Sequence, residues 1–250
     1  MRTVPLGNTG VEVSAFCLGT MYLGSREDKA TSYRLLDQYV EAGGSFLDTA
    51  NTYARWMPGC AGGESETLLG AWMRERKNRS RLFVATKVGF AYPGVERGLR
   101  AHQIQTECEK SLQRLRTDTI DLCQAHVDDR NTPMEETLEA FDRLVRAGKV
   151  RFVGASNFAV WRLEEAHGSA GRTAGPCTAP SSNTTHICAP GPAQVSPPRS
   201  RPTATCWTTA VPGASRCWPI RHCWAALTRA LTGLFLRSTS GQIATHAWQC

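Results

Sequence analysis

Four polar side chains in the first half of the chain could together deliver a proton to a carbonyl oxygen. They are Asp48 and Tyr53 in FLDTANTYA, Lys87 in VATKV and His126 in LCQAHVDD. A tyrosine with its ordinary pKa of about 10 is a weak acid at neutral pH. A neighbouring lysine cation favours the tyrosinate and lowers that pKa. The sequence therefore predicts that Tyr53 donates a proton and that Lys87 lowers its pKa.

The two remaining residues have supporting roles in the same chemistry. We expect Asp48 to pair with Lys87 and hold it in place, and His126 to donate a hydrogen bond to the substrate oxygen. The hydride that reduces the carbonyl carbon would come from a nicotinamide rather than from the protein. Taken singly, Asp48 could cap a helix, Tyr53 could be a loop aromatic and His126 could be structural. Lys87 is harder to set aside, because an unpaired buried ammonium is costly.

The elements that must position these residues alternate regularly along the chain. A hairpin is expected at 4–14, with its turn at Asn8-Thr9-Gly10. Apolar strands are expected at 15–20, 45–50, 82–87, 120–126 and 150–156. Periodic apolar residues predict helices at 28–44, 63–76, 103–116, 133–149 and 158–166. We expect Gly43 and Gly148 to end two of these helices, and Pro133 to lie in a first turn.

Strands that are apolar on both faces predict a parallel sheet with helices outside it. A doubly wound sheet and a (β/α)8 barrel both fit this pattern. The first strand–helix turn, LGTMYLGSRED, lacks the G-x-G-x-x-G of a dinucleotide-binding doubly wound fold. Polar residues instead follow the end of every strand, as in barrel enzymes: Thr20, Asp48, Lys87, His126, Ser156 and Asn157. We predict an α/β fold, an incomplete (β/α)8 TIM barrel of about five βα units with an irregular C-terminal tail.

The composition changes abruptly after residue 166. Residues 167–250 contain seven Arg but no Lys, Asp or Glu, and they hold nine of the 13 Pro and six of the ten Cys. Residues 1–166 carry 22 basic and 22 acidic side chains, so the net charge of +7 comes from the tail. We therefore predict a partial barrel over 1–166 and a disordered tail over 167–250, and no nucleic-acid partner for the barrel.

Five stretches carry a resemblance to a known family over roughly residues 1–166. GGSFLDTANTYA, ETLLGAWM, VATKVG, LCQAH and VGASNF, in this order, resemble the aldo-keto reductases. The resemblance implies a (β/α)8 barrel, NADPH or less often NADH, and a small aldehyde or ketone substrate, and we expect no metal. It also implies a catalytic tetrad of Asp48, Tyr53, Lys87 and His126. The cofactor-binding residues that it implies are Gly19, Thr20, Asp48, Ser156 and Asn157.

The chain departs from the family pattern in two places. Asp128 stands where family members often have proline. The last three strands, the glutamine under the nicotinamide and the residues for the adenosine phosphate are not found after residue 166. We interpret the tail as an out-of-frame translation, because CWPIRHCWAALTR read in a shifted frame permits LAYSALLGGAYTR, which resembles the family's seventh strand. A genuine extension is the alternative, as a basic arm or as a zinc site at Cys217, His222 and Cys223. The basic arm has weak support because the seven arginines are scattered. The zinc site has weak support because no paired C-x-x-C is present.

The sequence thus predicts an NAD(P)H-dependent carbonyl reductase or alcohol dehydrogenase that its C-terminus impairs. A non-catalytic reductase-like binding or regulatory subunit, or a pseudogene product, is the alternative. The opening MRTVPLGNTG lacks an apolar signal region and no apolar run is long enough to span a bilayer, so we expect a cytoplasmic protein. Four cysteines before residue 167 are interpreted as buried reduced thiols: Cys17, Cys60, Cys108 and Cys123. Trp56 and Met57 are expected either to form an apolar wall at the mouth or to pack within the loop.

Overall fold

The computed structural model describes residues 1–6, 9–159, 161–163, 165–166 and 169, and three short strands in the tail. These strands are β8 (Ile187–Cys188), β9 (Cys206–Thr209) and β10 (Cys217–Pro219), which pair antiparallel in the order β10-β9-β8. The other tail residues, and the side chains of Cys217, His222 and Cys223, lie outside the described part. The domain boundary at 166 and the disorder of the tail therefore stay predictions.

A five-stranded parallel sheet forms the centre of the molecule. Its strands pair in chain order: β3 (Cys17–Gly19), β4 (Phe46–Asp48), β5 (Phe83–Val88), β6 (Ile120–Ala125) and β7 (Val150–Ala155). In a doubly wound sheet the order of the strands reverses at a switch point, whereas these five strands follow one another in chain order. The prediction of an incomplete α/β barrel is confirmed.

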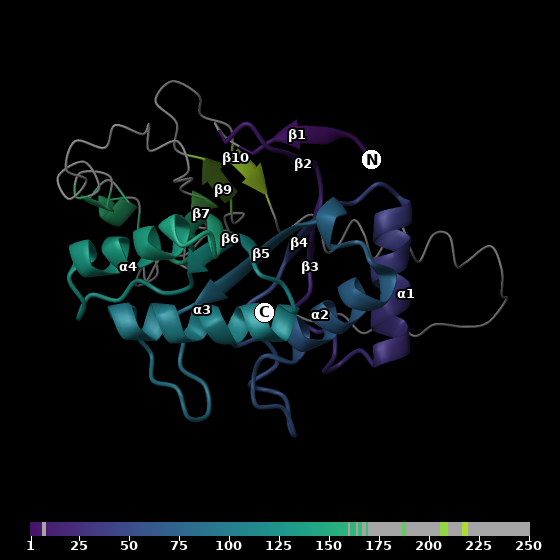
Figure 1. Cartoon of the computed structure of the whole chain (residues 1–250), viewed down its shortest axis with the longest axis horizontal. Helices are drawn as coiled ribbons and strands as arrows, with labels where there is room; N and C mark the ends of the chain where they lie inside the picture. The colour runs from purple at the N-terminus through teal and green to yellow at the C-terminus, as the bar shows by residue number, and fades with distance from the viewer. Residues whose placement is uncertain are drawn as a thin grey trace, which may run out of the picture.

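Four helices connect successive strands and cover one face of this sheet (Figure 1). They are α1 (Lys29–Glu41), α2 (Glu64–Arg76), α3 (Ala101–Leu115) and α4 (Met134–Arg146). α2 packs against α3 and α3 against α4, around a core that includes the fully buried Leu36, Leu69 and Trp72. Residues 161–163, 165–166 and 169 are helical as well. Each helix therefore lies within a few residues of its predicted range.

Glycines end two of the helices as predicted. Gly43 follows α1 with φ 84° and Gly148 follows α4 with φ 71°, a left-handed conformation that glycine adopts without steric cost. Pro133 was expected in the first turn of α4 but lies one residue earlier, at the N-cap. The lack of an N–H on proline is harmless at either position, because no helical carbonyl is available to accept it.

The N-terminal hairpin closes the amino end of the sheet. β1 (Thr3–Pro5) and β2 (Glu12–Ser14) pair antiparallel, and Leu6 and Val13 pack against Phe83 and Phe152 of the parallel strands. Side chains alternate between the two faces of a strand, so Phe83 and Ala85 face this inner cluster while Val84 faces the helices. Lys87, two residues after Ala85, shares their inner face at the other end of β5.

The two outer strands, β3 and β7, are less buried than β5 and β6. Every residue of β5 and β6 is buried, whereas Arg151 of β7 is exposed and all of β3 is half-buried. In the described ranges, β3 and β7 each pair with only one neighbour. Unpaired strand edges offer backbone N–H and C=O groups to other chains.

A buried carboxylate at the amino end of the sheet bonds to neighbouring strands. Asp121 of β6 is 3% exposed, accepts the backbone N–H of Val84 at 2.9 Å and pairs with Arg79 at 2.7 Å and Arg151 at 2.6 Å. Arg79 precedes β5 and Arg151 lies on β7, so this one side chain connects three neighbouring strands.

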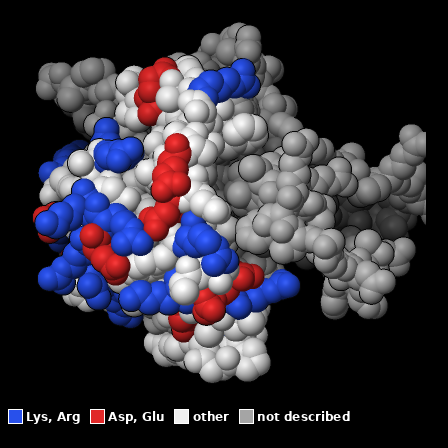
Figure 2. Space-filling model, turned by 90° about the vertical axis from the view of Figure 1, so that its right-hand side faces the viewer, with Lys and Arg blue, Asp and Glu red and all other residues white. Residues whose placement is uncertain are grey.

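The four cysteines before residue 167 differ in burial. Cys108 and Cys123 are buried thiols as predicted, but Cys17 and Cys60 are half-buried, and none of the four is in a disulfide. Basic and acidic side chains are mixed on the face shown in Figure 2. None of the helices in the described part is both long and apolar enough to cross a membrane.

Candidate active site

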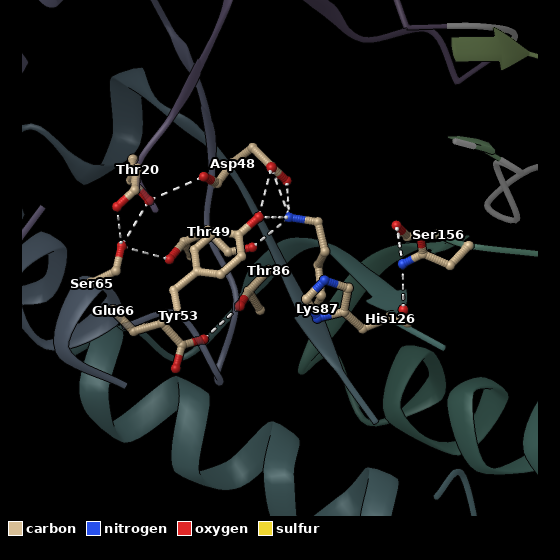
Figure 3. Close-up of polar contacts among 11 residues, drawn as sticks. Thr20, Asp48, Thr49, Tyr53, Ser65, Glu66, Thr86, Lys87, His126 and Ser156 are labelled. Atoms are coloured by element: carbon tan, nitrogen blue, oxygen red, sulfur yellow. Dashed lines mark hydrogen bonds and ion pairs between the residues drawn. The ribbon is translucent and has the colours of Figure 1, made fainter. Parts of the chain in front are cut away.

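The four residues predicted to do chemistry lie together at the carboxyl end of the sheet (Figure 3). Asp48 is the last residue of β4, Lys87 is the penultimate residue of β5 and His126 directly follows β6. Tyr53 lies in the loop after β4 and turns back over the strand ends. Because parallel strands end at one edge, residues far apart in the chain meet here.

Lys87 is the centre of the cluster. Its Nζ lies 2.7 Å from both carboxylate oxygens of Asp48 and donates to the Tyr53 hydroxyl and to the Thr49 carbonyl, each at 2.8 Å. The residue is 3% exposed. The buried ammonium is thus fully paired, and the contact with Asp48 that the sequence predicted is present.

The charges of this cluster are set by burial and pairing together. Burial lowers the pKa of Lys87, but the Asp48 carboxylate and the Tyr53 oxygen raise it more, so its pKa lies above its usual value. Burial raises the pKa of Tyr53 above its usual 10.0 although Lys87 acts in the opposite direction. The prediction that Tyr53 has a lowered pKa is therefore wrong. The lysine contribution has the expected sign, but burial of the phenol outweighs it, and Tyr53 keeps its proton at neutral pH.

His126 is an uncharged imidazole that packs against two aromatic side chains. Burial, then the positive charges of Lys87 and Arg55, lower its pKa to about 2. Phe90 packs edge-on against it at 4.6 Å between ring centroids, and Tyr53 at 6.0 Å. Its Nδ1 is buried and has no hydrogen-bond partner among the described residues. A neutral imidazole can donate one N–H to a ligand oxygen.

Hydroxyl groups fix the strand ends behind Asp48. The Thr20 hydroxyl donates to the Asp48 carbonyl at 3.0 Å and lies 2.8 Å from the Ser65 hydroxyl. The Ser65 hydroxyl donates to the Thr20 carbonyl at 2.8 Å and lies 3.0 Å from that of Thr49. Gly19, also a predicted site residue, is opposite Asp48 in the sheet register. Ser65 was not predicted, because a serine at the start of a helix is ordinarily only a cap.

Ser156 and Asn157 lie beside His126. The Asn157 side-chain nitrogen donates to the His126 carbonyl at 2.8 Å and to the Ser156 hydroxyl at 3.3 Å. Asn157 has φ 62°, a left-handed conformation that asparagine tolerates better than most residues. No donor to its side-chain oxygen is found in the described part of the chain.

A buried carboxylate that the sequence analysis missed anchors the loop of Tyr53. Glu107 of α3 is 4% exposed. It accepts hydrogen bonds from the Asn51 amide at 2.7 Å and the Tyr92 hydroxyl at 2.7 Å, and pairs with Lys110 at 2.8 Å. Asn51 lies two residues before Tyr53. Glu107 therefore connects α3 to the loops that follow β4 and β5.

A second missed carboxylate supports β5 from outside. Glu66 of α2 is fully buried, accepts the Thr86 hydroxyl, and pairs with Arg114 of α3 at 2.6 Å. Thr86 precedes Lys87 and faces the opposite side of the strand. The pair thus fixes β5 against two helices directly behind Lys87.

A hollow of about 360 Å³ opens next to the cluster. Arg55, Trp56, Ala91, Tyr92 and Pro93 line it. Trp56 is 49% exposed, and its ring lies 6.4 Å from that of Tyr53. Of the two residues predicted to form an apolar wall, Trp56 lines this hollow and Met57 does not.

Comparison with known proteins gives one family. The family model described as "Aldo/keto reductase family" matches residues 15–185. An uncharacterized oxidoreductase, YrpG of Bacillus subtilis, is 42% identical over 177 residues, which cover 68% of this chain and 53% of that protein. The norsolorinic acid reductase stcV of Emericella nidulans is 39% identical over 61% of this chain and 41% of that protein. The aldo-keto reductase YhdN of Bacillus subtilis is 33% identical over 66% of this chain and 49% of that protein. The chain spans about half the length of these relatives or less.

Proposed function

Since the chain belongs to the aldo-keto reductase family, we propose that it reduces a small aldehyde or ketone with a hydride from NADPH, or from NADH, and a proton from Tyr53. The family and the oxidoreductase names of its relatives support an oxidoreductase. One observation carries the finer assignment: a buried lysine, paired with a carboxylate, donates a hydrogen bond to the hydroxyl of Tyr53.

The proton would move from the Tyr53 hydroxyl to the carbonyl oxygen. The pKa of Tyr53 is raised, so the group carries this proton at neutral pH. Loss of the proton leaves a phenolate 2.8 Å from the Lys87 ammonium, which stabilises the new charge. Asp48 keeps that ammonium buried and in place. His126, neutral because of its depressed pKa, would donate a hydrogen bond to the carbonyl oxygen and orient it.

The residues after β7 fit a nicotinamide. Its carboxamide needs one donor and one acceptor, and the Ser156 hydroxyl and the Asn157 side-chain oxygen offer these beside His126. The bound nicotinamide supplies the hydride. Gly19, Thr20 and Asp48 border the same rim, and Thr20 fixes the end of β4 there. NADPH is proposed over NADH on the resemblance to the family.

We also propose that the C-terminal tail lowers activity. The described parallel sheet has five strands, whereas a complete barrel needs eight. Sequencing the gene tests the out-of-frame origin of the tail: nucleotides that do not permit LAYSALLGGAYTR in the shifted frame would exclude it.

The test of the function is aldehyde-dependent oxidation of NADPH by the purified 250-residue chain. Tyr53→Phe should lower kcat by at least about 100-fold, because a positioned proton donor contributes that much. Tyr33→Phe on α1 is the matched control and should leave kcat unchanged. A non-catalytic binding subunit would show no turnover and unchanged NADPH binding in both variants.

A further inference from the structure

We infer that Arg55 binds a carboxylate on an aromatic aldehyde or ketone, in the hollow beside the reacting groups. This inference rests on the proposed function and adds a substrate class to it. It is carried by the contacts of the guanidinium with Ala91 and Phe90, its lack of a described carboxylate partner and the aromatic lining of the hollow.

The guanidinium of Arg55 is exposed and makes two contacts with the loop that follows β5. Its Nη1 donates to the carbonyl of Ala91, and its Cζ lies 5.7 Å from the centroid of the Phe90 ring. A cation over an aromatic face is attracted by the ring. A side chain already held in its binding position loses less conformational entropy when a ligand arrives.

Arg55 differs from the other arginines near the strand ends. Arg114 pairs with Glu66 at 2.6 Å and Arg162 pairs with Asp128 at 3.0 Å. Among the described residues, no aspartate or glutamate pairs with Arg55. Its remaining N–H groups are in the planar arrangement that matches the two oxygens of a carboxylate.

The aromatic lining places Arg55 next to the reacting groups and favours a flat ligand. Phe90, under the guanidinium, packs edge-on against His126 at 4.6 Å. Trp56, the neighbour of Arg55, packs against Tyr53. Arg55 is therefore one ring away from His126, and its charge contributes to the low pKa of that residue. Tyr92 joins Trp56 in lining the hollow, and such surfaces suit an aromatic ring.

The backbone between Tyr53 and Arg55 is in an unusual conformation. Ala54 is buried and has φ 75°, a left-handed conformation that residues with a Cβ rarely adopt. This turn allows Tyr53 to contact Lys87 while Arg55 contacts Ala91. Backbone strain of this kind concentrates at functional sites, and here it lies between the proposed proton donor and the proposed anion-binding residue.

The experiment compares charged substrates with neutral ones of the same shape. kcat/KM is measured for para- and meta-carboxybenzaldehyde and for their methyl esters. The intact chain should prefer an acid over its ester by about 10-fold, the size expected of a charge-assisted hydrogen bond. Arg55→Gln should remove this preference and leave the esters within about 2-fold, while Arg55→Lys should keep part of it. Added salt should weaken the preference.

Arg97→Gln is the matched control, because Arg97 lies in the same loop as Tyr92, donates to the Asp128 carbonyl and does not line the hollow. It should leave the preference unchanged. Equal turnover of acids and esters by the intact chain, or an equal loss for both in Arg55→Gln, would overturn the inference while the reductase function stands.

If the chain reduces none of these aldehydes, the proposed function is contradicted. The role of Arg55 in binding a carboxylate is then tested by a binding measurement that does not depend on turnover. Terephthalate or its dimethyl ester is titrated into the protein, and the change in tryptophan fluorescence gives the dissociation constant. Terephthalate should bind at least about 10-fold more tightly than the ester and lose this advantage in Arg55→Gln. Equal binding of the two compounds would overturn the inference.

Discussion

The ammonium of Lys87 lies 2.8 Å from the hydroxyl of Tyr53 and 2.7 Å from the carboxylate of Asp48. In the proposed reaction, the Lys87 ammonium would stabilise the phenolate that proton transfer leaves on Tyr53, and removing it would leave the Asp48 carboxylate without this partner. We predict that Lys87→Met lowers kcat for aldehyde reduction by at least about 100-fold. Lys149→Met, which removes a half-exposed ion pair with Glu109, should keep kcat within about 2-fold. A Lys87→Met variant that retains a tenth of the activity would contradict the assignment of Lys87.

The depressed pKa of His126 predicts a loss of stability in acid. The pKa is about 2 in the folded chain, below the value of about 6.5 in an unfolded one. The unfolded state therefore binds the proton first as the pH falls. The free energy of unfolding should decrease below pH 6.5 by up to about 1.4 kcal/mol per pH unit, and this loss should continue towards pH 2.

Urea unfolding at a series of pH values measures this effect. His126→Gln should flatten the dependence between about pH 6.5 and 5, because most carboxyl groups, with ordinary pKa values of about 4, are still ionised there. His102→Gln, which removes an exposed histidine of α3, should keep it. Identical slopes for the intact chain and His126→Gln would show that His126 is not held neutral by its surroundings.

The contact between Lys87 and Asp48 could be predicted because it depends on short-range patterns. Alternation in VATKV places Lys87 on the face of Phe83 and Ala85, and parallel strands present their last residues at one edge. The pKa of Tyr53 could not be predicted in the same way. The sequence supplies its charged partner, but the degree of burial depends on how the loop after β4 packs over the strand ends.

The buried carboxylates of Glu66 and Glu107 could not be predicted either. Both occupy helical positions at which an acidic residue is ordinarily solvated. Their burial depends on Arg114 opposite Glu66 and on Asn51 opposite Glu107, and each partner comes from a segment far away in the chain. A one-dimensional pattern cannot show such pairing.

Glu107 is predicted to position the loop that carries Tyr53. Glu107→Ala removes the acceptor of the Asn51 amide and of the Tyr92 hydroxyl. It should destabilise the chain by about 2–3 kcal/mol, because buried donors lose a charged acceptor. It should also lower kcat, because Asn51 lies two residues before Tyr53.

Glu107→Gln keeps one acceptor oxygen and should therefore retain most of the kcat that Glu107→Ala loses. If Glu107 contributed to stability alone, kcat would not differ between the two variants. Glu109→Gln on the same helix, in a half-exposed pair with Lys149, should change the free energy of unfolding by less than about 1 kcal/mol. Unfolding in urea and steady-state kinetics give both readouts. An unchanged kcat in Glu107→Ala would leave Glu107 with a structural role alone.

Substitution of Asp121, at the amino end of the sheet, is predicted to cause a large loss in the free energy of unfolding. Its removal would leave the Val84 N–H without its acceptor and the half-buried Arg79 without its carboxylate. Asp121→Ala should therefore lower the free energy of unfolding by about 3–5 kcal/mol, as expected when one partner of a buried ion pair is lost. Asp142→Ala breaks a pair with Arg146 on the surface of α4 and should cost less than about 1 kcal/mol. Urea unfolding of the two variants measures the difference, and equal losses would mean that Asp121 does not hold the three strands together.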